Sequence, residues 1–290
     1  MSTFIPQGMG WIPDLPDARD FTCTHDAVVP LLRRLKKSRR KEPDEVDLRG
    51  ESEIDYFTLT ENQGPLNCST SHAVLSLVEY YERRIRGQTF EGSIRFLYKV
   101  TRNHIQKRPH ARGDTGADLR TTLKMLTHFG VPPTEHCPYD VSDYDEEPSA
   151  FLYRLAKPFP GLHYLRLDQP NQNGEKTWRI LKSFLAAGFP VVFGFPVPSS
   201  LTAADIIPFR PDLDSIRGGQ AVVAVGYRLN HLGRGKDAVL IRSSWGSEWG
   251  DNGNGWLPAA YLHKQLARDF WTLVCEQWLD PQELSLPKEI

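Results

Sequence analysis

Apolar positions in the first half of the chain recur at the spacing of amphipathic helices. Within residues 70–86 they include Ala73, Leu77, Tyr80 and Tyr81, and positions three or four apart lie on one face of a helix. We expect this segment to be a helix that buries that face. Similar patterns predict further helices over residues 91–103, 116–129 and 178–187.

The second half of the chain is patterned differently, in short runs rich in Val, Phe and Trp that glycines separate. Such runs are typical of buried strands. Helices followed by strands favour an α+β protein with two lobes, the first over about residues 46–145 and the second over about 160–279. The runs predict strands over residues 190–195, 220–228, 238–242, 255–257 and 270–276.

The bulk composition is that of an ordinary globular protein. The chain has 290 residues, of which 40% are hydrophobic and 24% are charged, so it can bury a substantial core. Its formal net charge of −1 gives no overall field that would attract nucleic acid. We therefore expect no nucleic-acid partner.

Basic residues are nevertheless crowded near the N-terminus, in a run over residues 33–41 that begins with Arg33 and ends with Lys41. Residues 1–45 as a whole are interpreted as a proline-punctuated leader that lies as a strap over the folded body. Its basic run is interpreted as a solvated linker or helix end, with docking to an acidic partner as the alternative.

Targeting and metal-binding signals are missing from the sequence. Residues 1–20 lack the charged start and apolar run of a signal peptide, and no apolar run approaches the ~20 residues of a membrane span. The cysteines are too scattered for a disulfide framework and include no CxxC pair typical of zinc sites. We expect a cytoplasmic protein without a cofactor, in which these thiols stay reduced: Cys23, Cys68, Cys137 and Cys275.

Three segments combine glycines with polar residues beside predicted elements. Residues 63–69 read QGPLNCS, residues 218–227 read GGQAVVAVGY and residues 241–250 read IRSSWGSEWG. In order, spacing and flanking residues they resemble the motifs of papain-like cysteine peptidases, most closely the bacterial branch whose nucleophile motif reads QGxLGSCTA. The likeness includes the leader, which reads GWIPDLPDARD over residues 10–20, and covers about residues 10–279.

This resemblance implies a papain-like α+β fold over residues 46–290, with a tail from about residue 280. A helical lobe and an antiparallel, barrel-like lobe would stand on either side of a cleft. In that family a cysteine at a helix N-terminus is the nucleophile, a histidine is its base, and an asparagine orients the histidine. A glutamine side chain and the nucleophile's own N–H stabilise the oxyanion.

The expected triad residues are replaced in this chain. Gln63 matches the oxyanion glutamine, but Ser69 stands where the resemblance puts the cysteine. Gln220 stands in place of the histidine and Ser243 in place of the asparagine. Because an amide does not accept a proton near neutrality, Gln220 cannot be a general base. We predict a site without a working triad, in which Gln220 and Ser243 hydrogen-bond to each other and leave no buried polar group unpaired.

Cys68 and Ser69 are the alternative nucleophiles. A shift that put Cys68 at the cysteine position would misalign the downstream matches and turn its side chain by about 100°, so Cys68 is interpreted as a packed thiol. Ser69 would need a general base and is interpreted as a helix cap, with Thr70 as the other candidate for that cap. His72 shares a helix face with Ser69, but helical side chains do not lean over the helix end, which favours a packing or surface role.

The favoured function is that of a catalytically inactive papain-like protein, a pseudopeptidase that captures a polypeptide segment or scaffolds a partner. One alternative is an active peptidase or amidase that uses Cys68 or Ser69 with an unrecognised base. The other is a structural assembly subunit whose contacts lie on the leader and the basic run. An open cleft would favour peptide binding, and an occluded cleft would favour the assembly subunit.

Overall fold

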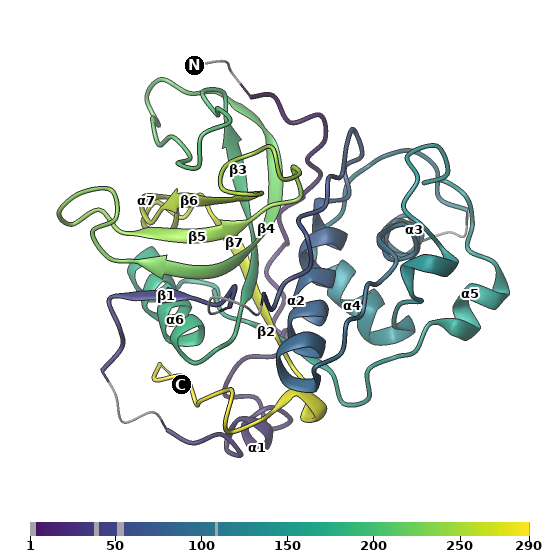
Figure 1. Cartoon of the computed structure of the whole chain (residues 1–290), viewed down its shortest axis with the longest axis horizontal. Coiled ribbons are helices and arrows are strands. Elements are labelled where there is room, and N and C mark those ends of the chain that lie inside the picture. The colour runs from purple at the N-terminus through teal and green to yellow at the C-terminus, as the bar shows by residue number, and fades with distance from the viewer. Residues whose placement is uncertain (1–3, 38–40, 51–54, 108–109, 290) are drawn as a thin grey trace.

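The computed structural model describes residues 4–37, 41–50, 55–107 and 110–289. Figure 1 shows two lobes side by side, one built of helices and the other around a sheet, with α2 at the boundary between them. The expected fold class, α+β with a helical lobe and an antiparallel sheet lobe, is confirmed.

The helical lobe is organised around α2, Ser69–Arg86, most of whose residues are buried. This helix ends at Gly87, whose φ of +62° suits a residue without a Cβ. Ser93 and Asp118 begin the next two helices with side-chain oxygens that accept a backbone N–H. The bounds of the other elements of this lobe are α3 Ile94–Ile105, α4 Leu119–Phe129, η1 Thr134–His136 and α5 Ala150–Leu155.

The sheet lobe contains one antiparallel sheet in the order β2-β7-β3-β4-β5-β6, and β1 pairs with β4. Of the strands described, β4 is the longest, and it pairs with β3 and β5 within the sheet. The strand bounds are β1 Glu45–Asp47, β2 His163–Arg166, β3 Val191–Pro198, β4 Ile216–Arg228, β5 Ala238–Arg242, β6 Asn254–Pro258 and β7 Arg268–Val274. The remaining helices are α1 Val29–Leu32, α6 Gly174–Ala186, α7 Ala260–His263 and η2 Glu276–Trp278.

Every predicted helix and strand is present, with ends that differ by up to four residues except where the prediction over 238–242 coincides with β5. The helix expected from residue 91 begins at Ile94 because Ser93 is its cap. Two strands, β1 and β2, have no signal in the hydrophobic pattern. They contain only three and four residues and are partly exposed, so no alternation can develop along them.

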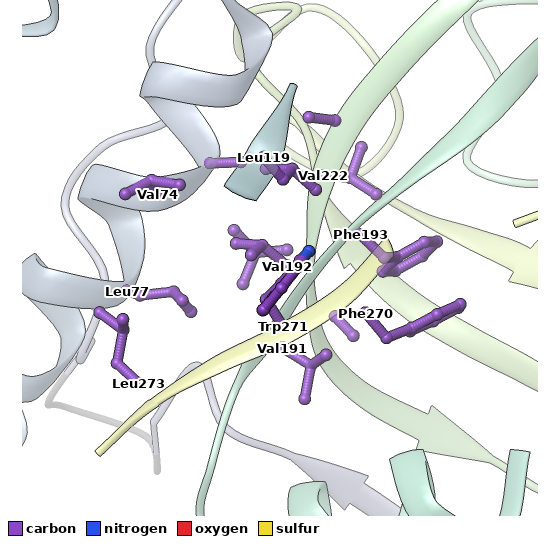
Figure 2. Packing of buried hydrophobic residues seen from close by; sticks show 14 of the residues in the cluster. Val74, Leu77, Leu119, Val191, Val192, Phe193, Val222, Phe270, Trp271 and Leu273 are labelled. Atoms are coloured by element: carbon purple, nitrogen blue, oxygen red, sulfur yellow. The ribbon is translucent and has the colours of Figure 1, made fainter. Parts of the chain in front are cut away.

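Apolar side chains from both lobes meet between α2 and the sheet, as Figure 2 shows. Val74 and Leu77 of α2 and Leu119 of α4 are fully buried there. Val192 of β3 and Trp271 of β7 belong to the same cluster and are also fully buried. This shared core fixes the N-terminal end of α2 against β4, which is where the candidate site lies.

The leader, which the sequence predicts to lie as a strap over the folded body, enters between the two lobes (Figure 1). Its later part, including α1, packs near the C-terminal end of the chain: Leu286 N donates to Lys36 O. Within the basic run Arg34 pairs with Glu276 at 2.8 Å, so this arginine has an acidic partner inside the chain. Residues 38–40 of the run lie outside the described residues.

Candidate functional site

The leader crosses the cleft as an extended segment that is hydrogen-bonded to both lobes. On the sheet side, Trp11 N donates to Gly219 O of β4 at 2.9 Å. On the helical side, Ile12 N donates to Ala117 O at 3.0 Å and Ala117 N donates to Gly10 O at 2.9 Å. These bonds form a parallel bridge between Trp11 and Ala117. The cleft is therefore occupied by the protein's own chain.

The carbonyl of Met9 lies between the two donors that the resemblance assigns to an oxyanion. Gln63 Nε2 donates to Met9 O at 3.0 Å, and Ser69 N donates to the same oxygen at 3.3 Å. Both donors belong to buried residues. Buried donors fixed in this way polarise or hold a carbonyl oxygen. A leader carbonyl thus occupies the position where the family's chemistry would place the reacting one.

Glycines in the leader allow this close approach. A Cβ on Gly8 would lie 2.3 Å from Leu66 O, and a Cβ on Gly10 would lie 2.0 Å from Asn67 O. Gly10 also has a φ of +106°, which a residue with a side chain adopts only with strain. No other residue type fits these two positions without moving the loop that precedes α2.

The side chain of Trp11 fills the space left by two glycines of the sheet lobe. A Cβ on Gly194 would lie 1.9 Å from the indole, and a Cβ on Gly219 would lie 2.7 Å from it. The indole Nε1 donates to Asp269 Oδ2 at 3.1 Å. Trp11 is 7% exposed, so it acts as the main apolar anchor of the leader.

Gln220 lies at the centre of a buried hydrogen-bond network. Its Nε2 donates to Gln63 Oε1 at 3.0 Å, to Ser244 Oγ at 3.1 Å and to Ser243 Oγ at 3.3 Å. Ser244 Oγ also donates to Gln63 Oε1 at 2.6 Å. The expected bond between Gln220 and Ser243 is present but is the longest of the three. Ser244 and the link to Gln63 have no signal in the motif comparison.

One part of the expectation for Gln220 is wrong. Its Oε1 is buried and has no hydrogen-bond partner among the described residues. The reason is geometric, because three acceptors surround Nε2 and fix the amide with its oxygen turned away from them. An unsatisfied buried oxygen of this kind costs about 1–3 kcal/mol. The site is neutral but is not optimised for stability.

Ser69 is not the expected helix cap. α2 begins at Ser69, its N-cap position is Cys68, and no side chain caps it. Ser69 Oγ instead accepts from Ala221 N of β4 at 3.2 Å, and Thr70 Oγ1 accepts from Thr122. Because the helix start is pressed against β4, the serine hydroxyl satisfies a buried amide of the sheet rather than one of its own helix.

Cys68 is buried on the side of the helix start that faces Tyr139. Its Sγ lies 3.2 Å from Tyr139 Oη, which donates to Gln63 O at 2.6 Å. The exposed fraction of Cys68 is 0%. This burial agrees with the interpretation of Cys68 as a packed thiol.

His72 is buried next to a carboxylate that the sequence patterns do not identify. Its Nδ1 lies 2.8 Å from Glu61 Oε2. Burial lowers the pKa of His72, but the nearby Cys68 and Glu61 outweigh it and raise this pKa to about 10. The raised pKa favours the protonated form of His72. Its Nε2 has no hydrogen-bond partner among the described residues.

A cavity of about 10 Å³ lies below this site. This volume is roughly that of one water molecule, so it cannot take a peptide side chain. It is lined by Glu61, His72, Ala73, Ser76, Ala221, Val223, Arg242, Ser243 and Ser244.

Chemically, the site provides donors for a carbonyl oxygen, and among the described residues no titratable side chain is hydrogen-bonded to the Ser69 hydroxyl. The described hydrogen-bond partners of the Ser69 hydroxyl and of Gln220 are a backbone amide and neutral side chains. A serine hydroxyl without a base is a weak nucleophile. The arrangement is suited to holding a peptide carbonyl.

Features of a membrane span or a metal site are absent from the described part of the chain. None of the helices in the described part of the chain is long and apolar enough to cross a membrane. Within the same residues, no group of three or more His, Cys, Asp or Glu side chains is placed to hold a metal ion. The four cysteines are free thiols.

Known proteins that resemble this chain are papain-like peptidases, although no family model matches the sequence. The chain is 28% identical over 292 residues to the uncharacterized peptidase C1-like protein L477 of Acanthamoeba polyphaga mimivirus, covering 96% of this chain and 89% of the relative. It is 25% identical over 218 residues to chymopapain of Carica papaya, covering 73% and 53%.

A solved structure agrees with these relatives. Xylellain, a cysteine protease from Xylella fastidiosa, matches with a TM-score of 0.72 and 28% identity, over 95% of this chain and 98% of that one. The sequence relatives and the fold therefore agree with the resemblance of the motifs around Gln63 and Gln220. The chain is similar in sequence and fold to papain-like, C1-type cysteine peptidases.

Proposed function

We propose that this protein is a pseudopeptidase, a papain-like protein that holds a polypeptide without cutting it. The proposal rests on the carbonyl oxygen of Met9, which accepts hydrogen bonds from both Gln63 Nε2 and Ser69 N. The groups that bind a peptide are thus retained and in use. The residues at the remaining triad positions are Gln220 and Ser243, which offer no base.

The retained donors have a use that does not require catalysis. In an active enzyme the same donors bind the carbonyl and stabilise the charge that develops on it. With Gln220 and Ser243 neutral, no charge develops, and the donors contribute only ordinary hydrogen bonds. The cleft then becomes a binding groove whose resident ligand is the leader, and a partner polypeptide would enter by replacing it.

The occupied cleft also favours a second candidate, a structural assembly subunit. In that case the leader never leaves, and the contacts with partners lie on outer surfaces. The leader bonds of Trp11 and Ile12 to both lobes support this candidate, because they tie the lobes together. The two candidates differ in one measurable property, namely whether the leader can be exchanged for another peptide.

Exchange can be measured with a fluorescent peptide of residues 4–20 and the full-length chain. Trp11→Ala should weaken the chain's own leader and let the labelled peptide bind, at least tenfold more tightly than to the parent, as read by fluorescence anisotropy. Leu15→Ala is the matched control, because this leader residue is 81% exposed and should behave like the parent.

A peptide that carries Gly10→Ala should not bind, since its Cβ would meet Asn67 O. If the Trp11→Ala chain folds normally yet binds no peptide, the cleft is not an exchangeable site and the assembly-subunit candidate is favoured.

A further inference from the structure

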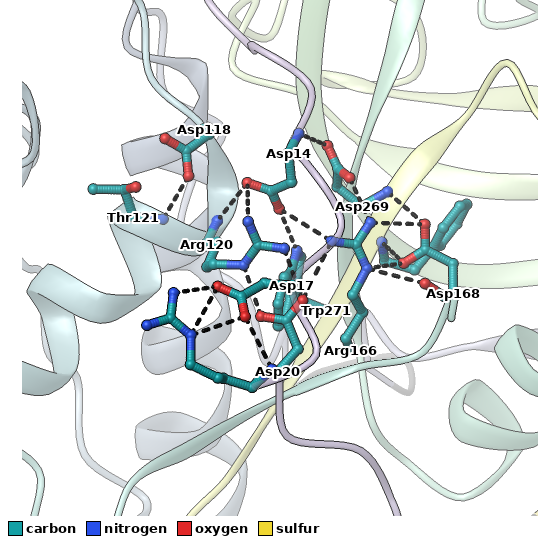
Figure 3. Close-up of polar contacts among 12 residues, drawn as sticks. Asp14, Asp17, Asp20, Asp118, Arg120, Thr121, Arg166, Asp168, Asp269 and Trp271 are labelled. Carbon is teal, nitrogen blue, oxygen red and sulfur yellow. Dashed lines mark hydrogen bonds and ion pairs between the residues drawn. The ribbon is translucent and has the colours of Figure 1, made fainter. Parts of the chain in front are cut away.

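A cluster of buried carboxylates and arginines joins the leader to both lobes beyond Trp11, as Figure 3 shows. We call it the leader cluster. The leader contributes two aspartates, and α4 and its N-cap contribute an arginine and an aspartate. The remaining members come from β2, from β7 and from the segment that follows β2. Its members are Asp14, Asp20, Asp118, Arg120, Arg166, Asp168 and Asp269.

The two arginines of the cluster differ in how closely they contact the leader. Arg120 makes two bonds of 2.7 Å to Asp20, through Nε and Nη2. Arg166 donates to Asp269 at 2.8 Å and pairs with Asp168 at 3.1 Å. Its Nη1 lies 3.7 Å from Asp14 and 3.6 Å from Asp20, too far for hydrogen bonds.

Asp14 is the least exposed carboxylate that the leader supplies. Its side chain is 0% exposed. Trp271 Nε1 donates to Asp14 Oδ2 at 3.1 Å, and Arg120 N donates weakly to Oδ1 at 3.4 Å. Both arginines reach it only at 3.7–3.8 Å. Asp14 therefore has neutral donors at close range and no short ion pair.

The cluster contains more negative than positive charge. Five carboxylates face two guanidinium groups, so full ionisation would leave about three uncompensated charges in a mostly buried space, which is costly. A proton on one carboxyl group relieves part of this cost.

The titratable and charged groups that face Asp14 come from every surrounding element. They are Asp17, Arg19 and Asp20 of the leader, Asp118 and Arg120 at the start of α4, Tyr164 and Arg166 of β2, Asp168 in the segment after β2, and Asp269 of β7.

We propose that the leader cluster is a proton-linked latch, which holds the leader in the cleft while Asp14 is protonated and loosens when that proton is lost. The release of the leader would open the groove of the proposed function. The proton linkage itself rests only on the cluster's geometry, and it can be tested without a partner.

The direction of the pH dependence follows from the charges. Burial raises the pKa of Asp14 to about 9, with Asp269 and Asp118 adding to the effect and Arg120 opposing it. Burial also raises the pKa of Asp269. For a carboxyl group whose pKa is raised by docking, docking is tightest below the ordinary pKa of about 4 and weakens as the pH rises towards 9. One linked proton changes docking by at most about tenfold per pH unit.

The test is amide hydrogen exchange of the full-length protein between pH 6 and pH 9, corrected for the pH dependence of the intrinsic exchange rate. Protection of the Trp11 and Ile12 amides should fall by up to about tenfold per pH unit. Protection of the amides in β3 and β4 should not fall with pH in this way. Asp14→Asn mimics the protonated form of Asp14, because the asparagine side-chain oxygen can still accept a hydrogen bond from Trp271. This variant should make the protection of the leader amides independent of pH. Asp17→Asn, at an exposed pair with Arg19, should keep the parent's slope.

Asp118→Asn provides a second variant in case Asp14→Asn does not dock its leader. Asparagine is as good an N-cap as aspartate, so α4 should be retained. Because one negative charge is removed from the cluster, the leader's protection should depend less steeply on pH. The proposal is overturned if the parent's leader protection is flat, if the sheet amides lose protection equally, or if both variants keep the full slope. None of these results depends on whether the groove exchanges peptides, so the proposed function stands or falls separately.

Discussion

At the scale of single residues, the position of the leader depends on glycines, where a Cβ would collide with a neighbouring segment. A Cβ on Gly10 would lie 2.0 Å from a backbone oxygen of Asn67, and backbone atoms cannot rotate aside as a flexible side chain can. We predict that Gly10→Ala releases the leader and raises its sensitivity to limited proteolysis by at least tenfold.

The matched control for this change is Gly233→Ala. Gly233 has a φ of +114°, close to that of Gly10, but a Cβ there would meet no atom within 4 Å. Both variants carry the cost of a side chain at positive φ, of order 1–3 kcal/mol, and only Gly10→Ala carries the collision. Equal proteolysis of the two variants would show that the collision between the new Cβ at position 10 and Asn67 O does not release the leader from the cleft.

The residues of the site differ in how far the sequence could predict them. Motif spacing brings Gln63, Ser69, Gln220 and Ser243 to one place, and the structure has them within one set of contacts. The roles of Ser244 and of the Glu61–His72 pair could not be predicted, because they depend on side-chain directions across the two lobes. The Ser69 cap was wrong for the same reason, since a local preference gave way to an amide of β4.

At the scale of elements, the start of α3 depends on one buried hydroxyl. Ser93 Oγ accepts from Phe96 N at 3.2 Å and donates to Cys137 O at 2.6 Å. Ser93→Ala should lower the free energy of unfolding by about 2–3 kcal/mol, because it removes the cap and leaves a buried carbonyl unpaired. Chemical denaturation followed by circular dichroism measures this loss.

Ser149→Ala is the control for the cap of Ser93. Ser149 occupies the same N-cap position at α5, but its side chain makes no capping bond. Its replacement should cost less than about 0.5 kcal/mol. If the two alanine variants lost the same stability, the bonds of Ser93 would not be what stabilises the start of α3.

Elements with a clear apolar pattern were predictable from sequence, and elements without one were not. The helix around Leu77 has apolar residues at helical spacing, and the strand over 238–242 is a short apolar run that is buried throughout. β1 and β2 are three and four residues long and are held by pairing with β4 and β7. Such pairing between distant segments leaves no periodic signal in a short stretch.

At the scale of the whole molecule, the leader forms part of the interface between the lobes. The likeness of residues 10–20 to a family leader indicated that the segment docks, but not where it docks. Its path is set by bonds to Gly219 on one lobe and Ala117 on the other, two positions about a hundred residues apart in the sequence. An occupied cleft therefore could not be derived from the leader's own composition.

The proposed function requires that the site binds a peptide but lacks the groups to cut it. Triad residues act as a unit, so Ser69→Cys, Gln220→His and Ser243→Asn are needed together to rebuild a site over the retained Gln63. Each variant is compared with the parent in chains that also carry Trp11→Ala, so that the leader does not block substrate.

The decisive measurement is hydrolysis of a panel of fluorogenic peptides by these chains. We predict no hydrolysis above background by the parent or by the parent with Trp11→Ala, almost none by any single triad variant, and measurable hydrolysis by the triple variant with Trp11→Ala. Hydrolysis by the Trp11→Ala parent that disappears on Cys68→Ala or Ser69→Ala would overturn the pseudopeptidase proposal and establish an active peptidase.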